Sequence, residues 1–201
     1  MEARNGRSSL LLATPDRVAA LSEQLIHVHQ ALRERLASLH QEAAGNTGPD
    51  AADAALPEDL LSHCLSFCAA IHAHHSGEDD QLLPALRAAA PDLAPVIDNL
   101  IEDHDLVAGI LRRIRELLTP GQAPSSPGAL MRELDGLTAI LESHFSYEER
   151  RIAKALDTLE PQAWTADVFT PGQAPSRRYC REARIEVVAH ERISVALPAR
   201  V

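Results

Sequence analysis

The sequence contains four long stretches in which apolar residues return every three or four positions, and this period constrains the fold more than any other feature. Such spacing places apolar side chains on one face of an α-helix, and each helix must bury that face against a neighbour. The alternating pattern of a β-strand does not occur before residue 180. The predicted helices cover residues 14–45, 57–90, 92–118 and 129–159.

Loop-forming residues separate the four stretches. Thr14 and Pro15 are typical of a helix start, and the segment 119–128 is rich in Pro and Gly. We therefore predict an all-α fold, an antiparallel up-down-up-down four-helix bundle over residues 14–160. Residues 161–201 lose the helical period, and we expect an irregular, partly disordered C-terminal tail with two weak strands.

Composition excludes several classes of function. The net charge of −10 and the aromatic content of 3% argue against a nucleic-acid-binding surface, which needs Lys, Arg and stacking rings. No apolar run is long enough to cross a membrane, and Leu10–Leu12 is too short for a signal-peptide core, so we expect a cytoplasmic protein.

Cys64 and Cys68 lie one helical turn apart without further Cys nearby, which favours small core residues over a zinc-binding pair.

The chain has ten His, and their helical phase separates them into two groups. With about 100° per residue, each predicted helix directs at least one His toward its apolar face. In two of the helices a Glu, Glu78 or Glu148, follows an inward His by four residues. The inward group is His29, His74, His75, His104 and His144, whereas we assign His27, His40, His63, His72 and His190 to the surface or to helix edges.

The inward groups lie at one height in the predicted bundle. At ~1.5 Å per residue, their distances from the helix ends agree within roughly one turn if neighbouring helices alternate in direction. A single buried His usually finds a hydrogen-bonding partner, but several buried imidazoles and carboxylates together are costly without a cation. Imidazole and carboxylate without thiolate suit iron, with manganese or zinc as competitors, and two carboxylates can bridge a pair of ions. The His-Glu-x-x-His motif of zinc proteases and the Glu-x-x-His pair of ferritin-like bundles are absent from the sequence.

These motifs resemble the hemerythrin-like family, the HHE cation-binding domains. The family pattern is an isolated His, then His-x-x-x-Glu, then an isolated His, then His-x-x-x-Glu. It is matched in order by His29, His74 to Glu78, His104, and His144 to Glu148. The segments HHSGEDDQLLPAL, from His74, and HFSYEERRI, from His144, are similar to two family signatures. The resemblance extends over residues 14–160.

The resemblance implies a non-haem di-iron centre bridged by the two Glu. In the oxygen-carrying marine hemerythrins the third helix supplies a second His one turn later, where this chain has Ala108. Their fourth helix uses an Asp five residues after its His, whereas here Glu148 follows after four. The pattern is similar to that of bacterial iron-centre repair proteins and of iron-sensing domains in eukaryotic ubiquitin-ligase adaptors. Reversible oxygen carriage is therefore not what we expect.

Four further residues near the predicted site have two interpretations each. His74 has the family spacing to Glu78, and the adjacent His75 is either an added ligand or a group that supports one. Asp79 and Glu149 are candidates for orienting the ligands, but we expect them to be solvated surface charges. Tyr147 is a candidate for contacting a bound small molecule, but we expect a core residue at a helix interface.

We predict a di-iron protein that binds or senses a small oxidant (oxygen, nitric oxide or peroxide) or the iron state of the cell. The alternative is a regulatory protein-interaction module in which the metal is structural, with a protein partner that the sequence does not identify. A metal-free bundle with core His is a third interpretation. An enzymatic activity on an organic substrate is left open, although the sequence contains no nucleophile elbow, phosphate loop or nucleotide motif.

Overall fold

A computed structural model describes residues 20–46, 56–119, 127–160 and 168–169 of the chain. Every regular element in these ranges is helical, which confirms the all-α class and a helical bundle. The elements are α1 (Leu21–Gly45), α2 (Glu58–Gly77), the π-helix η1 (Glu78–Leu82), α3 (Leu83–Ala89), the 3₁₀-helix η2 (Pro91–Leu93), α4 (Ala94–Leu118) and α5 (Pro127–Leu156). In the described part of the chain, no helix combines the length and the apolar character needed to cross a membrane.

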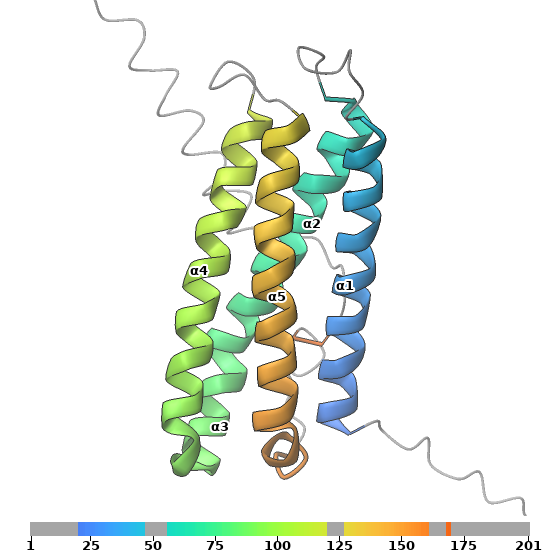
Figure 1. Cartoon of the computed structure of the whole chain (residues 1–201). Helices are drawn as coiled ribbons and strands as arrows, with labels where there is room; N and C mark the ends of the chain where they lie inside the picture. Colours follow the sequence, from blue (N-terminus) through green and yellow to red (C-terminus); the bar gives the residue numbers. More distant parts are fainter. Residues whose placement is uncertain (1–19, 47–55, 120–126, 161–167, 170–201) are drawn as a thin grey trace, which may run out of the picture.

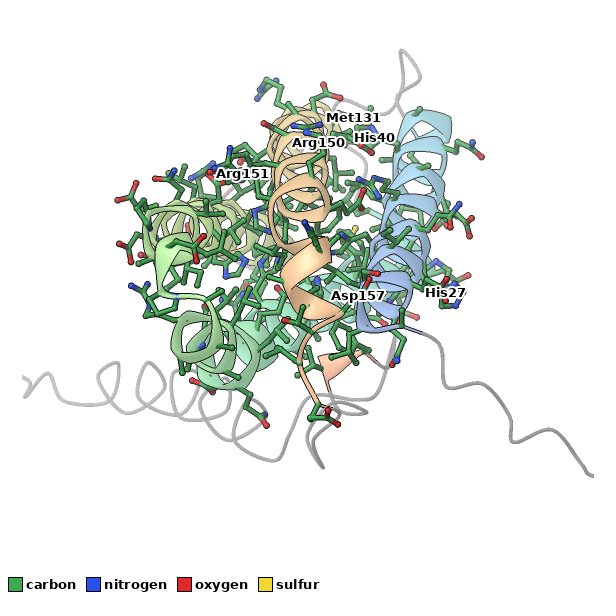
Figure 2. All side chains as sticks on the ribbon, turned by 90° about the horizontal axis from the view of Figure 1, so that it is seen from below. His27, His40, Met131, Arg150, Arg151 and Asp157 are labelled. Carbon is green, nitrogen blue, oxygen red and sulfur yellow. The ribbon has the colours of Figure 1, made fainter. Side chains whose placement is uncertain are left out.

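Four long helical rods lie side by side, and α2, η1 and α3 together form one of them (Figure 1). Hydrogen bonds between rods set their register. Near one end of α1, the Ser22 hydroxyl donates to Asp157, which lies just beyond α5 at that end of the bundle (Figure 2). Near the other end of α1, His40 contacts the Thr138 hydroxyl at 2.9 Å. The contacts of α4 with α5 follow a similar order, Asn99 with Tyr147 and Arg113 with Glu133.

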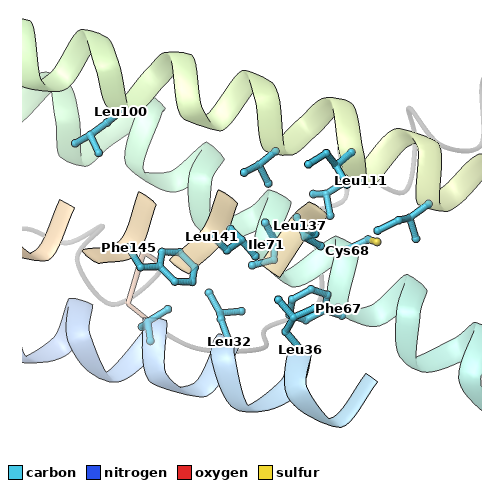
Figure 3. Packing of buried hydrophobic residues seen from close by; sticks show 14 of the residues in the cluster. Leu32, Leu36, Phe67, Cys68, Ile71, Leu100, Leu111, Leu137, Leu141 and Phe145 are labelled. Atoms are coloured by element: carbon cyan, nitrogen blue, oxygen red, sulfur yellow. The ribbon is translucent and has the colours of Figure 1, made fainter. Parts of the chain in front are cut away.

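The apolar stripes of the predicted helices meet in one core. Phe67 and Phe145 are its largest fully buried side chains, and Figure 3 shows them among Leu and Ile side chains from facing helices. Burying one Leu or Ile side chain contributes about 1.5–3 kcal/mol, so these stripes drive the assembly of the rods. The predicted stripe of the first helix is buried in full: Leu21, Leu25, Val28, Leu32, Leu36 and Leu39.

The second predicted helix, residues 57–90, is interrupted by the π-helix η1. Pro84 explains the interruption, because proline has no N–H to donate and its ring clashes with the carbonyl four residues earlier. The N–H of Leu83 donates to the carbonyl of Glu78, five residues earlier, which widens the turn. Glu78, Leu82 and Leu83 are all fully buried. The wide turn therefore lets the rod pass the proline while Glu78 still faces the core.

The described helix α1 begins at Leu21, later than the predicted start at Thr14 and Pro15, which lie outside the described residues. Ala20 is extended, with φ −54° and ψ 148°, so α1 does not continue through it. The backbone N–H and the hydroxyl of Ser22 donate to the two carboxylate oxygens of Asp157, at 3.0 and 2.8 Å. A carboxylate next to the end of α5 thus caps α1 and favours a start at this point.

Two residues of the predicted tail, Val168 and Phe169, are buried in the same core as the helices. Val168 packs against Gly77, the last residue of α2, where a Cβ would lie 3.3 Å from a methyl carbon of Val168. A side chain at position 77 would press on Val168, which lies directly beside the backbone that precedes Glu78. The disorder and weak strands predicted for the rest of the tail fall outside the described residues, so the domain limits 14–160 and 161–201 stay predictions.

Cys64 and Cys68 are buried core residues, as the sequence predicts. Burial, with a smaller effect of the Glu42 charge, raises the pKa of the Cys64 thiol to about 11. Burial and the neighbouring Cys64 raise the pKa of Cys68 to about 12. Both thiols are therefore protonated at neutral pH, and a protonated thiol is a poor nucleophile.

We expect both buried thiols to resist a disulfide reagent such as DTNB at pH 8, because less than roughly one in a hundred is thiolate and the reagent cannot reach it. The test uses the full chain with Cys180→Ser, so that only Cys64 and Cys68 remain to react. No thiol should react in native buffer, and both should react at once in guanidinium chloride. Rapid reaction in native buffer would contradict the buried assignment.

Candidate metal centre

The inward polar residues predicted from the sequence lie together in one buried cluster. His29 comes from α1, His74 from the last turn of α2, and Glu78 from the start of η1. The remaining members come from α4 and α5. All six are at most 5% exposed: His29, His74, Glu78, His104, His144 and Glu148. Each of the four rods therefore contributes at least one side chain to a single place in the core.

The four imidazoles form two close pairs. Nε2 of His29 lies 3.1 Å from Nε2 of His74, and Nε2 of His104 lies 3.2 Å from Nε2 of His144. Two nitrogen ligands at ~2.1 Å from one ion, at a right angle, are about 3.0 Å apart. Both pairs therefore have the spacing of two neighbouring ligands on one metal ion.

The two carboxylates connect the two His pairs. One oxygen of Glu78 lies 3.4 Å from Nε2 of His74, and its other oxygen lies 3.6 Å from Nε2 of His104. One oxygen of Glu148 lies 3.4 Å from Nε2 of His29 and 3.6 Å from Nε2 of His144. Each Glu thus faces one imidazole from each pair, which is the placement of a bridging carboxylate.

Six polar atoms of the cluster are buried without a hydrogen-bond partner among the described residues: Nδ1 of His74, Nε2 of His75 and the four carboxylate oxygens of Glu78 and Glu148. Leaving one such atom unsatisfied costs about 1–3 kcal/mol, and the whole stability of a domain is about 5–15 kcal/mol. Protein groups alone therefore satisfy this cluster poorly. Cations between the imidazoles and the carboxylates would satisfy it.

Burial acts on the two carboxylates with opposite outcomes. Burial raises the pKa of Glu148, but the close His29 and the charges of His144 and His74 outweigh it and hold this pKa at about 2. Burial lowers the pKa of His29, but Glu148 and Glu149 outweigh it and raise this pKa. For Glu78, burial and the charge of Glu148 act together and raise the pKa well above its usual value. One protonated imidazole thus balances Glu148, whereas Glu78 needs a proton or a cation of its own.

An outer set of carboxylates contacts the far side of three of the imidazoles. Nδ1 of His29 donates to Glu149 at 2.9 Å, and Nδ1 of His104 donates to Asp79 at 2.7 Å. Asp103 lies 3.4 Å from Nδ1 of the third imidazole, that of His144. Because a carboxylate can only accept, these contacts place a proton on Nδ1 and make Nε2 the nitrogen that would bind a cation, which in His29 would displace the Nε2 proton.

The surface role expected for Asp79 and Glu149 is therefore wrong, since both contact imidazoles of the centre. Glu149 is also held by Arg33, whose Nη1 donates to it at 2.9 Å, and Arg33 in turn donates to Glu142 at 3.1 Å. The proximity of His29 and Arg33 outweighs burial and lowers the pKa of Glu149. It stays an ionised acceptor for His29.

Phe145 and Asp103 are members of the site that the sequence analysis did not single out. The Phe145 ring stacks on His29 with centroids 4.0 Å apart and an angle of 15°. The Arg33 guanidinium lies 5.1 Å from the centroid of the Phe145 ring, so this ring contacts both an imidazole and a guanidinium. The signal available in the sequence was adjacency, because Phe145 directly follows His144 and Asp103 directly precedes His104.

His75 lies in the same cluster, on the side of α4 and α5. Its ring stacks on His104, with centroids 4.1 Å apart and an angle of 10°, and meets the ring of His144 edge-on at 5.2 Å. Burial, and then the charges of neighbouring imidazoles, lower the pKa of His75 and of His74 well below the usual value. Both are therefore neutral, which is the form of imidazole that binds metals.

The other residues considered for the site lie away from its centre. His27 is exposed on the outer side of α1, and His40 is half-buried at the contact with Thr138 (Figure 2). His63 pairs with Glu42 at the surface. Tyr147 packs against the core and accepts a hydrogen bond from Asn99, which confirms the interface role expected for it. His72 is half-buried, and His190 falls outside the described residues.

Comparison with known proteins agrees with this geometry. The family model of the hemerythrin HHE cation binding domain matches residues 20–156, which extend from the start of α1 to the end of α5. Neither a search of curated proteins nor one of solved structures gives a match. The family match covers most of the chain and includes every side chain of the buried cluster. The chain belongs to the hemerythrin family of HHE cation-binding domains.

Proposed function

We propose that this protein holds a pair of non-haem iron ions and uses them to bind or sense a small oxidant. His29 and His74 would bind one ion and His104 and His144 the other, with Glu78 and Glu148 bridging them. One observation carries the proposal. Two imidazole pairs with nitrogen separations of 3.1 and 3.2 Å are joined by two carboxylates that each face both pairs.

The donor set supports iron over the other candidates. The centre offers imidazole and carboxylate, and Cys64 and Cys68 are outside both groups of described residues that could hold a metal. Imidazole with carboxylate is the donor set of non-haem iron proteins that keep open positions for a small molecule. A bound iron pair would supply one-electron chemistry and an open position for oxygen, nitric oxide or peroxide.

The protein's own residues prepare this site in three ways. The bridging and outer carboxylates supply negative charge that offsets two divalent cations. The contacts of Glu149, Asp79 and Asp103 with Nδ1 atoms fix the ring orientations and make the imidazoles better donors. The buried surroundings, with Phe145 stacked on His29, keep bulk water from the bridging carboxylates.

The proposal includes an up-down-up-down antiparallel order of the four rods, an order in which the predicted ligand heights agree. The pairings of Ser22 with Asp157 and of His40 with Thr138 support it for α1 and α5. We also propose a cytoplasmic location, which the free thiols of Cys64 and Cys68 support, because reduced thiols persist there.

The full chain, reconstituted with Fe(II) without air and then desalted, should retain about two iron ions per chain. Mixing this protein with oxygen, nitric oxide or peroxide in a stopped-flow instrument should change its near-ultraviolet and visible absorption. Glu148→Ala should lose at least one ion, because it removes a bridge, whereas His27→Ala should match the parent. A folded parent chain without iron, or iron with no response to any of the three oxidants, would overturn the proposal.

Replacing Glu149 by Gln should weaken iron binding by about 10–100-fold without changing the number of ions bound, because it removes the charged partner of His29 Nδ1. The affinity is measured by competition with a coloured chelator. Glu142→Gln is the matched control, because Glu142 contacts Arg33 and is half exposed. Equal affinities for the two variants would show that Glu149 does not orient His29.

A second function, a regulatory module with a structural metal, is favoured by the origin of the ligands in all four rods. An ion bound by all four rods links iron supply to folding. At a thousand times the dissociation constant, Fe(II) should stabilise the chain by about 4 kcal/mol, and hence raise its melting temperature by on the order of 10 °C. His104→Ala should abolish this rise and His27→Ala should keep it. A large rise in melting temperature, together with no absorption change on mixing with the oxidants, would favour this function over oxidant sensing.

A further inference from the structure

We propose that His75 is a fifth imidazole ligand, and that it binds the ion held by His104 and His144. This inference rests on the ion pair proposed above. It makes the two ions unequal: one would have three imidazoles and the other two. The group of three comprises His75, His104 and His144, and the described ligand atoms of these residues lie within 4.8 Å of one another.

The first support is the environment of the His75 ring. The residue is 5% exposed, and its Nε2 is buried without a hydrogen-bond partner among the described residues. A core imidazole with a purely structural role normally has its buried nitrogens satisfied. Asp79 follows His75 by four residues, but its carboxylate contacts Nδ1 of His104 at 2.7 Å instead. Nε2 of His75 therefore needs a partner other than Asp79.

The second support is the reach of the ring. Two nitrogen ligands ~2.1 Å from one ion are at most about 4.2 Å apart. The three ring nitrogens, within 4.8 Å of one another, approach that limit, so a shift of less than about 1 Å brings all of them to a common ion. The stacking of His75 on His104 places the two rings side by side, with their planes 10° apart.

The third support is the helix from which this ring comes. Ala108 follows His104 by one helical turn and is exposed, so α4 provides no second imidazole there. His75 reaches the His104 side of the cluster from α2, because α2 ends with two adjacent inward His rather than one. The chain thus supplies a third imidazole to this ion from a different helix.

The test compares the parent with His75→Ala, His75→Gln and the exposed-site control His27→Ala, all as full chains, by anaerobic titration with ⁵⁷Fe(II). The parent should bind two ions with two distinct Mössbauer doublets. Both His75 variants should bind one of the ions at least about a hundredfold more weakly, because loss of a ligand exceeds the 10–100-fold effect of losing an outer contact. Added free imidazole should restore the second ion in His75→Ala, which a supporting residue would not allow.

Two readouts separate the possible failures. If the parent binds no metal, the proposed function fails and this inference fails with it. If the parent binds two ions and both His75 variants keep their stoichiometry, affinity and doublets, only the role of His75 is overturned.

Circular dichroism checks folding, and a melting experiment on His75→Leu extends the comparison. With a chelator present, His75→Leu should melt above the parent, because it removes a buried unsatisfied nitrogen, and with Fe(II) present it should lose that advantage.

Discussion

The structure depends on one electrostatic constraint, the burial of two carboxylates within 4 Å of four imidazoles in an apolar core. Protein groups can balance only part of this charge, because His29 compensates Glu148 while Glu78 is left with a raised pKa. The rest of the bundle holds the side chains of this cluster in place. The apolar stripes above and below the cluster provide the free energy of folding, which offsets the cost of leaving polar atoms unsatisfied at the centre.

Much of this arrangement could be predicted from sequence, because helical periodicity is a local property. The phase of His29, His104 and His144 within their apolar stripes identifies them as buried, and all three are buried. The spacing of four residues between His74 and Glu78 puts both on one helix face, and they lie 3.4 Å apart. The convergence of the rods at one height then follows from helix length and connection length. For these residues, the local pattern and the family resemblance lead to the same assignment.

The features that could not be predicted depend on contacts between helices. Asp79 was expected at the surface, and its i, i+4 neighbour on the same helix is His75, but its partner is His104 on α4. Glu149 likewise reaches across to His29 and Arg33 on α1. Such pairs depend on how two rods are rotated about their axes, which a one-dimensional pattern does not define. The start of α1 is a similar case, since Asp157 comes from a segment more than a hundred residues away in the chain.

The rod that departs most from regular geometry is also the one that contributes most to the cluster. Residues 74–78 supply two imidazoles and one carboxylate that faces both His pairs, and the π-helix begins at Glu78 itself. Pro84 forces a wide turn at this level, and Gly77 admits Val168 against the backbone just before Glu78. The proline follows Glu78 in this rod, and the glycine that packs against Val168 directly precedes it. The segment that contributes the most side chains to the cluster is therefore also the one in which a π-helix turn and a close backbone contact lie next to Glu78.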